Sequence, residues 1–159
     1  MQGAAKPRAR RSPSPGFSLI EVLAVLACIL ILAMLAYPAY ASYVVKARRA
    51  EAESALLELL QQQEQYYTLH NSYIAFSAES STPEARRYRW WSGSRAASSS
   101  HELRGDACAD GGIDTCIVLV ALPGTERVDR HYRDPDCETL TLQSTGARGA
   151  SGPSARCWP

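Results

Sequence analysis

The chain has 159 residues, of which 46% are hydrophobic, and carries a net charge of +1. This length suits one modest domain plus an N-terminal segment and excludes two large independent cores. Four of the 17 basic residues precede Gly16, so the rest of the chain has 13 basic and 16 acidic residues, a net charge of −3. That balance excludes a polycation that binds nucleic acid over its whole surface.

The first predicted element is an apolar helix over residues 19–36. Its only charged side chain is Glu21. As a helix the run would extend for roughly 27 Å, close to the hydrocarbon thickness of a bilayer. Four cations lie before Gly16, which favours a cytoplasmic N-terminus by the positive-inside tendency. The rest of the chain is then expected on the far side of the membrane, in an oxidising compartment.

The N-terminal part of the chain resembles a known family. The stretch that begins at Gly16, GFSLIEVLAVLACILILAMLAYPAYASYVVKARRAEAESALLELL, resembles the N-terminus of type IV pilin precursors, PilE-like minor pilins among them. In that family a prepilin peptidase cleaves after the glycine and methylates the new amino terminus. The resemblance implies a leader over residues 1–16, N-methylation of Phe17, and a transmembrane and filament-core helix over residues 17–38 with a kink at Pro38.

Glu21 matches the acidic residue of the family. A charged side chain inside a bilayer costs on the order of 2.5–3.5 kcal/mol on insertion scales, so the carboxylate needs a cationic partner. The resemblance implies that the amino terminus of Phe17 in a neighbouring subunit supplies that charge during filament assembly.

Two other interpretations of this segment stay open. The motif AYA, residues 39–41, could be the cleavage site of a removable secretory signal, cut after Ala41. The motif VLAC, residues 25–28, faintly resembles a lipoprotein cleavage box, but the apolar run continues past it. Cys28 is therefore interpreted as a small hydrophobic residue.

An amphipathic helix is predicted over residues 39–70. Apolar and aromatic residues recur at steps of three and four from Ala52 to His70, and the glutamates fall on other faces. A continuous helix from Phe17 to His70 would be roughly 80 Å long. Since that exceeds any small core, one half must lie in lipid or against sister helices and the other against its own domain. A coiled coil is the alternative for the second half, although no strict heptad is evident.

Residues 73–114 are the least regular part of the chain. Within them, the motif RRYRWW at residues 86–91 alternates cations with aromatic residues. It could contact DNA or another surface through phosphate binding and stacking. The contact residues would be Arg86, Arg87, Arg89, Trp90 and Trp91. The interpretation that we favour is a short strand with Tyr88 and Trp90 turned inward and two of the arginines turned outward.

Three strands are predicted after this loop, over residues 115–122, 126–133 and 137–144. The first is apolar and β-branched, and the last alternates plainly. Short strands with turns between them indicate an antiparallel sheet with a helix over one face. The predicted fold class is α+β, a long N-terminal helix packed on a small antiparallel sheet in a globular head over residues 71–159, which is the pilin lollipop.

Four cysteines lie in the predicted head: Cys108, Cys116, Cys137 and Cys157. They allow three connectivities, of which sequence order favours Cys108–Cys116 with Cys137–Cys157. The second bond would close a loop of about twenty residues and contribute roughly 3 kcal/mol in the chain-entropy model. The final stretch, DPDCETLTLQSTGARGASGPSARCWP, also resembles the end of PilE-type minor pilins, which implies a disulfide-closed C-terminal loop. Zinc is the alternative, but the chain has no C-x-x-C pair.

Enzymatic motifs are absent from the sequence. It has no G-x-S-x-G elbow, P-loop, H-E-x-x-H or G-x-G-x-x-G, and its three histidines are scattered among polar neighbours. The stretch DACADGGID, residues 106–114, partly matches a calcium loop, but Cys108 and Ile117 stand where oxygen ligands belong. We expect no catalysis, no cofactor and no metal.

Together these features predict a structural subunit of a type IV pilus, a minor pilin. It would be held in the inner membrane and then assembled with other pilin subunits into an extracellular filament for motility, adhesion or DNA uptake. Prepilin peptidase and the inner-membrane assembly machinery are the other expected partners. The alternatives are a pseudopilin of type II secretion and a periplasmic module that binds DNA or a surface.

Overall fold

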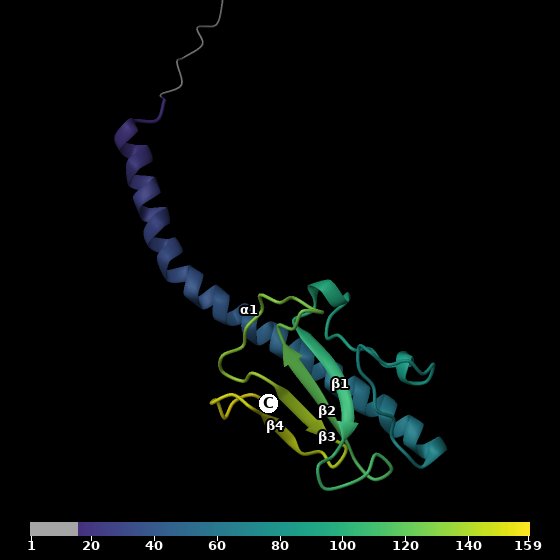
Figure 1. Ribbon diagram of the computed structural model, residues 1–159. Helices are drawn as coiled ribbons and strands as arrows, with labels where there is room; N and C mark the ends of the chain where they lie inside the picture. Colours follow the sequence, from purple (N-terminus) through teal and green to yellow (C-terminus); the bar gives the residue numbers. More distant parts are fainter. Residues whose placement is uncertain (1–15) are drawn as a thin grey trace, which may run out of the picture. The chain divides into compact units, whose positions relative to one another are not determined.

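The computed structural model describes residues 16–159, so the predicted leader, apart from Gly16, lies outside the described residues. One helix is followed by two 3-10 turns and four strands (Figure 1). The chain divides after Tyr40 into two units. The second, Ala41–Pro159, is called the folded unit below.

Helix α1, Leu19–His70, begins after Ser18, whose carbonyl accepts the backbone N–H groups of Glu21 and Val22. All side chains from residue 16 to residue 40 are exposed. An 18-residue window of the helix has a mean hydropathy of 2.9, so its length and composition would let it cross a bilayer. Pro38 lies inside the helix, where it has no N–H to donate to the helical ladder.

From Ala41 onward, one side of α1 is buried. The buried positions are three or four residues apart, as the amphipathic pattern predicts: Arg49, Ala52, Ala55, Leu56, Leu59 and Gln63. The helix ends at His70, the predicted boundary. Asn71 then adopts a left-handed conformation with φ of 51° and donates its N–H to the carbonyl of Tyr67 at 2.8 Å, which satisfies an end carbonyl of the helix.

The sheet contains β1 (His101–Ala107), β2 (Ile117–Pro123), β3 (Leu140–Gln143) and β4 (Arg148–Ala150). All neighbours are antiparallel in the order β1-β2-β3-β4. In the folded unit α1 runs along one face of this sheet (Figure 1). The buried core includes leucines of both layers: Leu56, Leu59, Leu103, Leu119, Leu140 and Leu142. The α+β prediction is confirmed.

The strand predicted over residues 126–133 is wrong. Its two buried apolar residues, Val128 and Tyr132, are four residues apart. In a strand Arg130 would lie on the same face as these two, but it is exposed. The segment instead turns, because Tyr132 donates its N–H to the carbonyl of Asp129 at 3.0 Å. The Tyr132 hydroxyl then contacts the carbonyl of Val45 in α1 at 3.3 Å.

The strand predicted over residues 86–91 is also wrong. Its first residues lie in a 3-10 turn, η1 (Ala85–Arg87), and the second such turn is η2 (Ala96–Ser98). Tyr88 is buried as expected, but the segment makes only an isolated bridge to the sheet, between Trp91 and Glu102. The strands β1 and β4 were not predicted from sequence.

Candidate functional site

The segment between α1 and β1 is held against the outer edge of β1 at two places. Phe76 exchanges two backbone hydrogen bonds with Gly105, at 3.0 and 2.9 Å. The carbonyl of Trp90 and the N–H of Ser92 bond to the backbone of β1 at 2.8 and 3.1 Å. Residues 77–89 therefore form a loop with both ends fixed on the sheet. This 77–89 loop carries the three arginines of the RRYRWW motif.

The 77–89 loop is packed onto the core. Ala85 and Tyr88 are buried, and the ring of Tyr88 stacks on Phe76 with centroids 5.2 Å apart. Burial raises the pKa of the Tyr88 hydroxyl to about 12, so the side chain is neutral at physiological pH. The tight turn η1 leaves Arg86 and Arg87 exposed between these two buried anchors. The arginines are thereby presented to solvent from a fixed backbone.

A charged contact ties the same loop to the sheet. Arg127 forms ion pairs with Glu79 of the loop and with Glu102 of β1, the second at 3.2 Å. Glu102 is only 8% exposed, and its carboxylate also accepts a hydrogen bond from the hydroxyl of Thr125. Because Arg127 offsets the charge of Glu79, that carboxylate opposes an anion near the loop less strongly than a free one would.

The arginines of the motif differ in how far their donors are engaged. Arg89 forms a 3.2 Å ion pair with Glu58 of α1. Arg86 donates through Nε to the carbonyl of Ser80 at 3.1 Å. Within residues 16–159, the side chain of Arg87 makes no hydrogen bond or ion pair. Its guanidinium therefore has all of its donors available to a ligand.

The two tryptophans of the motif pack against each other. The rings of Trp90 and Trp91 are edge to face, with centroids 5.1 Å apart and an interplanar angle of 80°. The Nε1 atom of Trp91 is buried and has no acceptor among the residues that the structure describes. A buried donor without a partner costs free energy, so an acceptor that reached it would be stabilising.

These side chains surround a cavity of about 330 Å³, called the arginine cavity below. Its wall consists of Ser77, Ala78, Ser80, Arg86, Arg87, Tyr88, Arg89, Trp90 and Trp91. The structure thus brings all five residues of the predicted contact surface to one cavity. Guanidinium groups bind phosphate oxygens in a planar, often bidentate geometry, and indole rings offer stacking surfaces. The cavity therefore suits an anion that carries an aromatic group.

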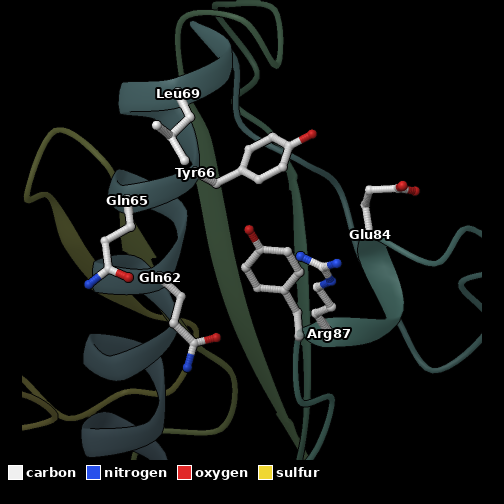
Figure 2. Close-up of a pocket in the computed structure, with 7 residues that line it drawn as sticks. Gln62, Gln65, Tyr66, Leu69, Glu84 and Arg87 are labelled. Atoms are coloured by element: carbon white, nitrogen blue, oxygen red, sulfur yellow. The ribbon is translucent and has the colours of Figure 1, made fainter.

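A second cavity, of about 250 Å³, lies beside the first and is called the tyrosine cavity below. Its wall consists of Gln62, Gln65, Tyr66, Leu69, Glu84, Arg87 and Tyr88. Figure 2 shows Tyr66 extending from α1 toward the side on which Glu84 and Arg87 lie. The helix residues of this wall were not predicted as site residues. Their spacing is that of any helix face, and it does not indicate that the 77–89 loop lies opposite.

The four cysteines of the folded unit form two disulfides. Cys108 is bonded to Cys116 and Cys137 to Cys157, with Cα atoms 5.5 Å apart in each pair. This is the connectivity that sequence order favours. Beyond the second disulfide, Trp158 donates its indole N–H to the carbonyl of Gly149 at 2.9 Å. The C-terminal segment is thus held beside β4.

The residues 106–114, which partly match a calcium loop, lie around the first disulfide. No group of three or more metal-ligating side chains occurs in the part of the chain that the structure describes. Cys28, outside the folded unit, is a free and exposed thiol.

The residues implied in processing and assembly lie in the first unit. Phe17, just before α1, and Glu21, in its first turn, line a shallow groove together with Val22, Val25 and Leu26. Phe17 is 84% exposed. Gly16 precedes them as an exposed residue. Phe17 and Glu21 therefore share one groove at this end of the described chain.

Two family models match the chain. Residues 38–141, more than half of its length, match the family described as "Type IV minor pilin ComP, DNA uptake sequence receptor". The chain belongs to this family of type IV minor pilins. Residues 11–37 of the minor pilin match the prokaryotic N-terminal methylation motif.

A type IV pilin from Shewanella oneidensis is among the solved structures that are similar to this chain. It is 23% identical to this minor pilin, with a TM-score of 0.45, and the match covers 72% of this chain and 98% of that chain. Among curated proteins, none matches.

Family membership confirms the predicted class of function. The minor pilin is a structural subunit of a type IV pilus that assembles with other pilins. Its apolar helix anchors it in the inner membrane before it enters the filament. The match favours a pilus subunit over a type II secretion pseudopilin and over a periplasmic module released by cleavage after Ala41.

Proposed function

We propose that this minor pilin binds DNA at the 77–89 loop and serves DNA uptake by the pilus. The observation that carries the proposal is the arginine cavity, which gathers the cations and indoles of the RRYRWW motif. The cavity lies inside the stretch that matches a family described as a DNA uptake sequence receptor. The protein would act as a binding subunit, without a catalytic step of its own.

The charge distribution supports this site over a general electrostatic surface. Two glutamates that contact this region, Glu58 and Glu79, are each engaged by an arginine, while Glu84 of the loop lines the tyrosine cavity together with Arg87. Arg86 and Arg87 are exposed and have no carboxylate partner in the part of the chain that the structure describes. Binding should therefore be local and should weaken steeply with salt, because each phosphate that is neutralised releases counterions.

DNA binding by the full-length protein in detergent tests the proposal, with fluorescence anisotropy of a labelled oligonucleotide as the measurement. We expect the Arg86→Gln, Arg87→Gln double variant to lower the slope of log affinity against log salt by about 2. The matched control is Arg130→Gln with Arg156→Gln, which removes two exposed arginines from other loops and should change the slope little. No binding of the wild-type protein at low salt would refute the proposal.

We also propose how the precursor matures. Prepilin peptidase would cleave after Gly16 and methylate Phe17, which leaves the apolar helix in the mature chain. The mature chain would then comprise the membrane and filament-core helix over residues 17–38, the amphipathic helix over 39–70 and the head over 71–159. The match of residues 11–37 to the methylation motif supports this. Mass spectrometry of the mature N-terminus tests it: methylated Phe17 is expected, and Ser42 as first residue would contradict it.

Glu21 is proposed to pair with the amino terminus of a neighbouring subunit. Its groove with Phe17 supports this role, and removal of one charge would strand the other in apolar surroundings. Glu21→Ala should insert in the membrane but enter pili poorly, whereas Val22→Ala, a change in the same groove, should be incorporated. Normal incorporation of Glu21→Ala would contradict the pairing.

A further inference from the structure

The two cavities of the folded unit share a wall. Arg87 and Tyr88 line both the arginine cavity and the tyrosine cavity. Tyr88 is buried and stacks on Phe76, so this part of the shared wall has a fixed position. The side chain of Arg87 makes no hydrogen bond or ion pair within residues 16–159, and Figure 2 shows it on the wall of the tyrosine cavity. A ligand that occupied both cavities would pass this guanidinium.

The tyrosine cavity has the chemistry of a pocket for a planar heterocycle. The ring of Tyr66 stacks on the imidazole of His70, with ring centroids 3.9 Å apart, and Tyr66 also lines the cavity, so it supplies an aromatic surface there. Gln65 supplies an amide that can donate and accept, and Glu84 supplies an acceptor. Amides pair with base edges, and carboxylates accept from the exocyclic amino groups of bases.

The arginine cavity next to it has the chemistry of a phosphate pocket. Arg86 and Arg87 supply cationic donors on its wall. The Nε1 of Trp91 supplies a buried donor that lacks an acceptor among the described residues, and phosphate oxygens are strong acceptors. A base pocket and a phosphate pocket that share one arginine match the parts of a nucleotide.

We propose that the site binds an unpaired nucleotide of DNA, with its base in the tyrosine cavity and its phosphate in the arginine cavity, and thus prefers single-stranded DNA to a blunt duplex. This inference rests on the proposed function. The base-binding side chains come from α1 and from the 77–89 loop and line one recess between them. A stacked and paired base cannot enter such a recess unless it is extruded, which costs free energy.

Affinities of the wild-type full-length protein for three oligonucleotides test the inference at one fixed salt concentration. These are a single strand, its blunt duplex and the duplex with a single-stranded tail. We expect the single strand and the tailed duplex to bind at least roughly tenfold more tightly than the blunt duplex, because neither requires base extrusion. This comparison needs no variant, so it does not depend on the folding of one.

Two variants then separate the cavities. Tyr66→Leu should abolish the preference for single strands and leave the affinity for blunt duplex unchanged, whereas Arg87→Gln should weaken binding of all three. The matched control is Tyr43→Leu, an exposed tyrosine of α1 outside both cavities, which should keep the preference.

Equal affinity of the wild-type protein for single strand and blunt duplex would overturn the nucleotide pocket and leave the proposed DNA binding intact. An equal loss of affinity for all three in Tyr66→Leu would do the same. Failure to bind any oligonucleotide would overturn the proposed function as well.

Discussion

Arg49 and Arg87 belong to the same folded unit, but their guanidinium groups have opposite surroundings. Arg49 is 6% exposed and donates two hydrogen bonds to Asp134, at 2.7 and 2.6 Å. Arg87 is exposed and has no side-chain partner in the part of the chain that the structure describes. The charge of Arg49 is thus committed to the fold, while the charge of Arg87 is available for binding. The comparison shows that the role of an arginine follows from its contacts and burial.

The buried pair is held in its charged form by mutual contact. The hydrogen bond to Asp134 raises the pKa of Arg49 above its ordinary value, and burial opposes this. Burial raises the pKa of Asp134, but the hydrogen bonds from Arg49 and from the backbone N–H of Cys137 outweigh it and hold that pKa below its usual range. A buried ion pair with satisfied hydrogen bonds tolerates desolvation that a single charge would not.

The sharpest test of this contrast is removal of Arg49. Arg49→Ala leaves the Asp134 carboxylate buried and uncompensated, so the free energy of unfolding should fall by about 3–5 kcal/mol. Urea unfolding of the full-length protein in detergent, followed by tryptophan fluorescence, measures it. The double variant Arg49→Met, Asp134→Leu should lose much less. An equal loss of unfolding free energy in Arg49→Ala and in the double variant would contradict this. It would mean that Arg49 stabilises the fold through packing and not through its charge.

The disulfide beside this pair gives the next largest expected effect. Cys137 donates its N–H to Asp134 at 3.2 Å, and its bond to Cys157 spans 20 residues. Replacing both cysteines by serine should lower the free energy of unfolding by about 2–5 kcal/mol. The Cys108–Cys116 bond spans 8 residues, so its removal should cost about 0.8 kcal/mol less in the chain-entropy model. Non-reducing mass spectrometry verifies the pairing first.

A pH effect should mark the same region. His101 is fully buried, and its ring lies 5.1 Å from that of Tyr132. Burial lowers the pKa of His101 from 6.5 to about 4; Arg49 adds to the lowering and Asp134 opposes it. The unfolded chain therefore binds a proton between these values that the folded chain does not. The contribution of neutral His101 to the free energy of unfolding is therefore fully present well above pH 6.5. It should fall by on the order of 3 kcal/mol as the pH drops to about 4.

Unfolding free energies of wild type and His101→Phe at pH 7 and pH 4.5 measure this effect. The variant keeps an aromatic ring but cannot ionise, so its stability should change less across the window. The same decline in both proteins would assign the pH dependence to other groups.

The smallest expected effect on stability belongs to Arg87. Because its side chain is exposed and makes no hydrogen bond or ion pair within residues 16–159, Arg87→Gln should change the free energy of unfolding by less than about 0.5 kcal/mol. The slope of log DNA affinity against log salt should nevertheless fall by about 1. A variant that is destabilised as strongly as Arg49→Ala would erase the distinction between the two arginines.

Sequence patterns predicted α1 well, because its two halves carry strong signals: an uninterrupted apolar run and then a stripe with helical spacing. They missed β1 because its inward positions are His101, Leu103 and Gly105, of which only one is a typical buried strand residue. Position 105 has no room for a side chain, because a Cβ there would lie 2.7 Å from the ring of Phe76. The strand β4 has three residues and no large apolar side chain, so it leaves no pattern to detect.

Only one part of the candidate site could be predicted from the sequence. The RRYRWW motif could be recognised because its residues are adjacent in the chain. The tyrosine cavity combines Tyr66 of α1 with Glu84 of the loop, and only the folded backbone brings them together. The Arg49–Asp134 pair is separated by 85 positions, and no periodic pattern links such residues.

Both edges of the sheet are shielded. The outer edge of β1 bonds to the backbone of Phe76, Trp90 and Ser92, and β4 is short, with Trp158 donating to the carbonyl of Gly149. An open strand edge is a template for pairing with another chain, and hence for aggregation. A precursor that is concentrated in a membrane before export would meet many copies of itself. Because its strand edges are covered, the protein does not present the sheet for edge-to-edge pairing with those copies. Contacts between subunits can then form through the helix.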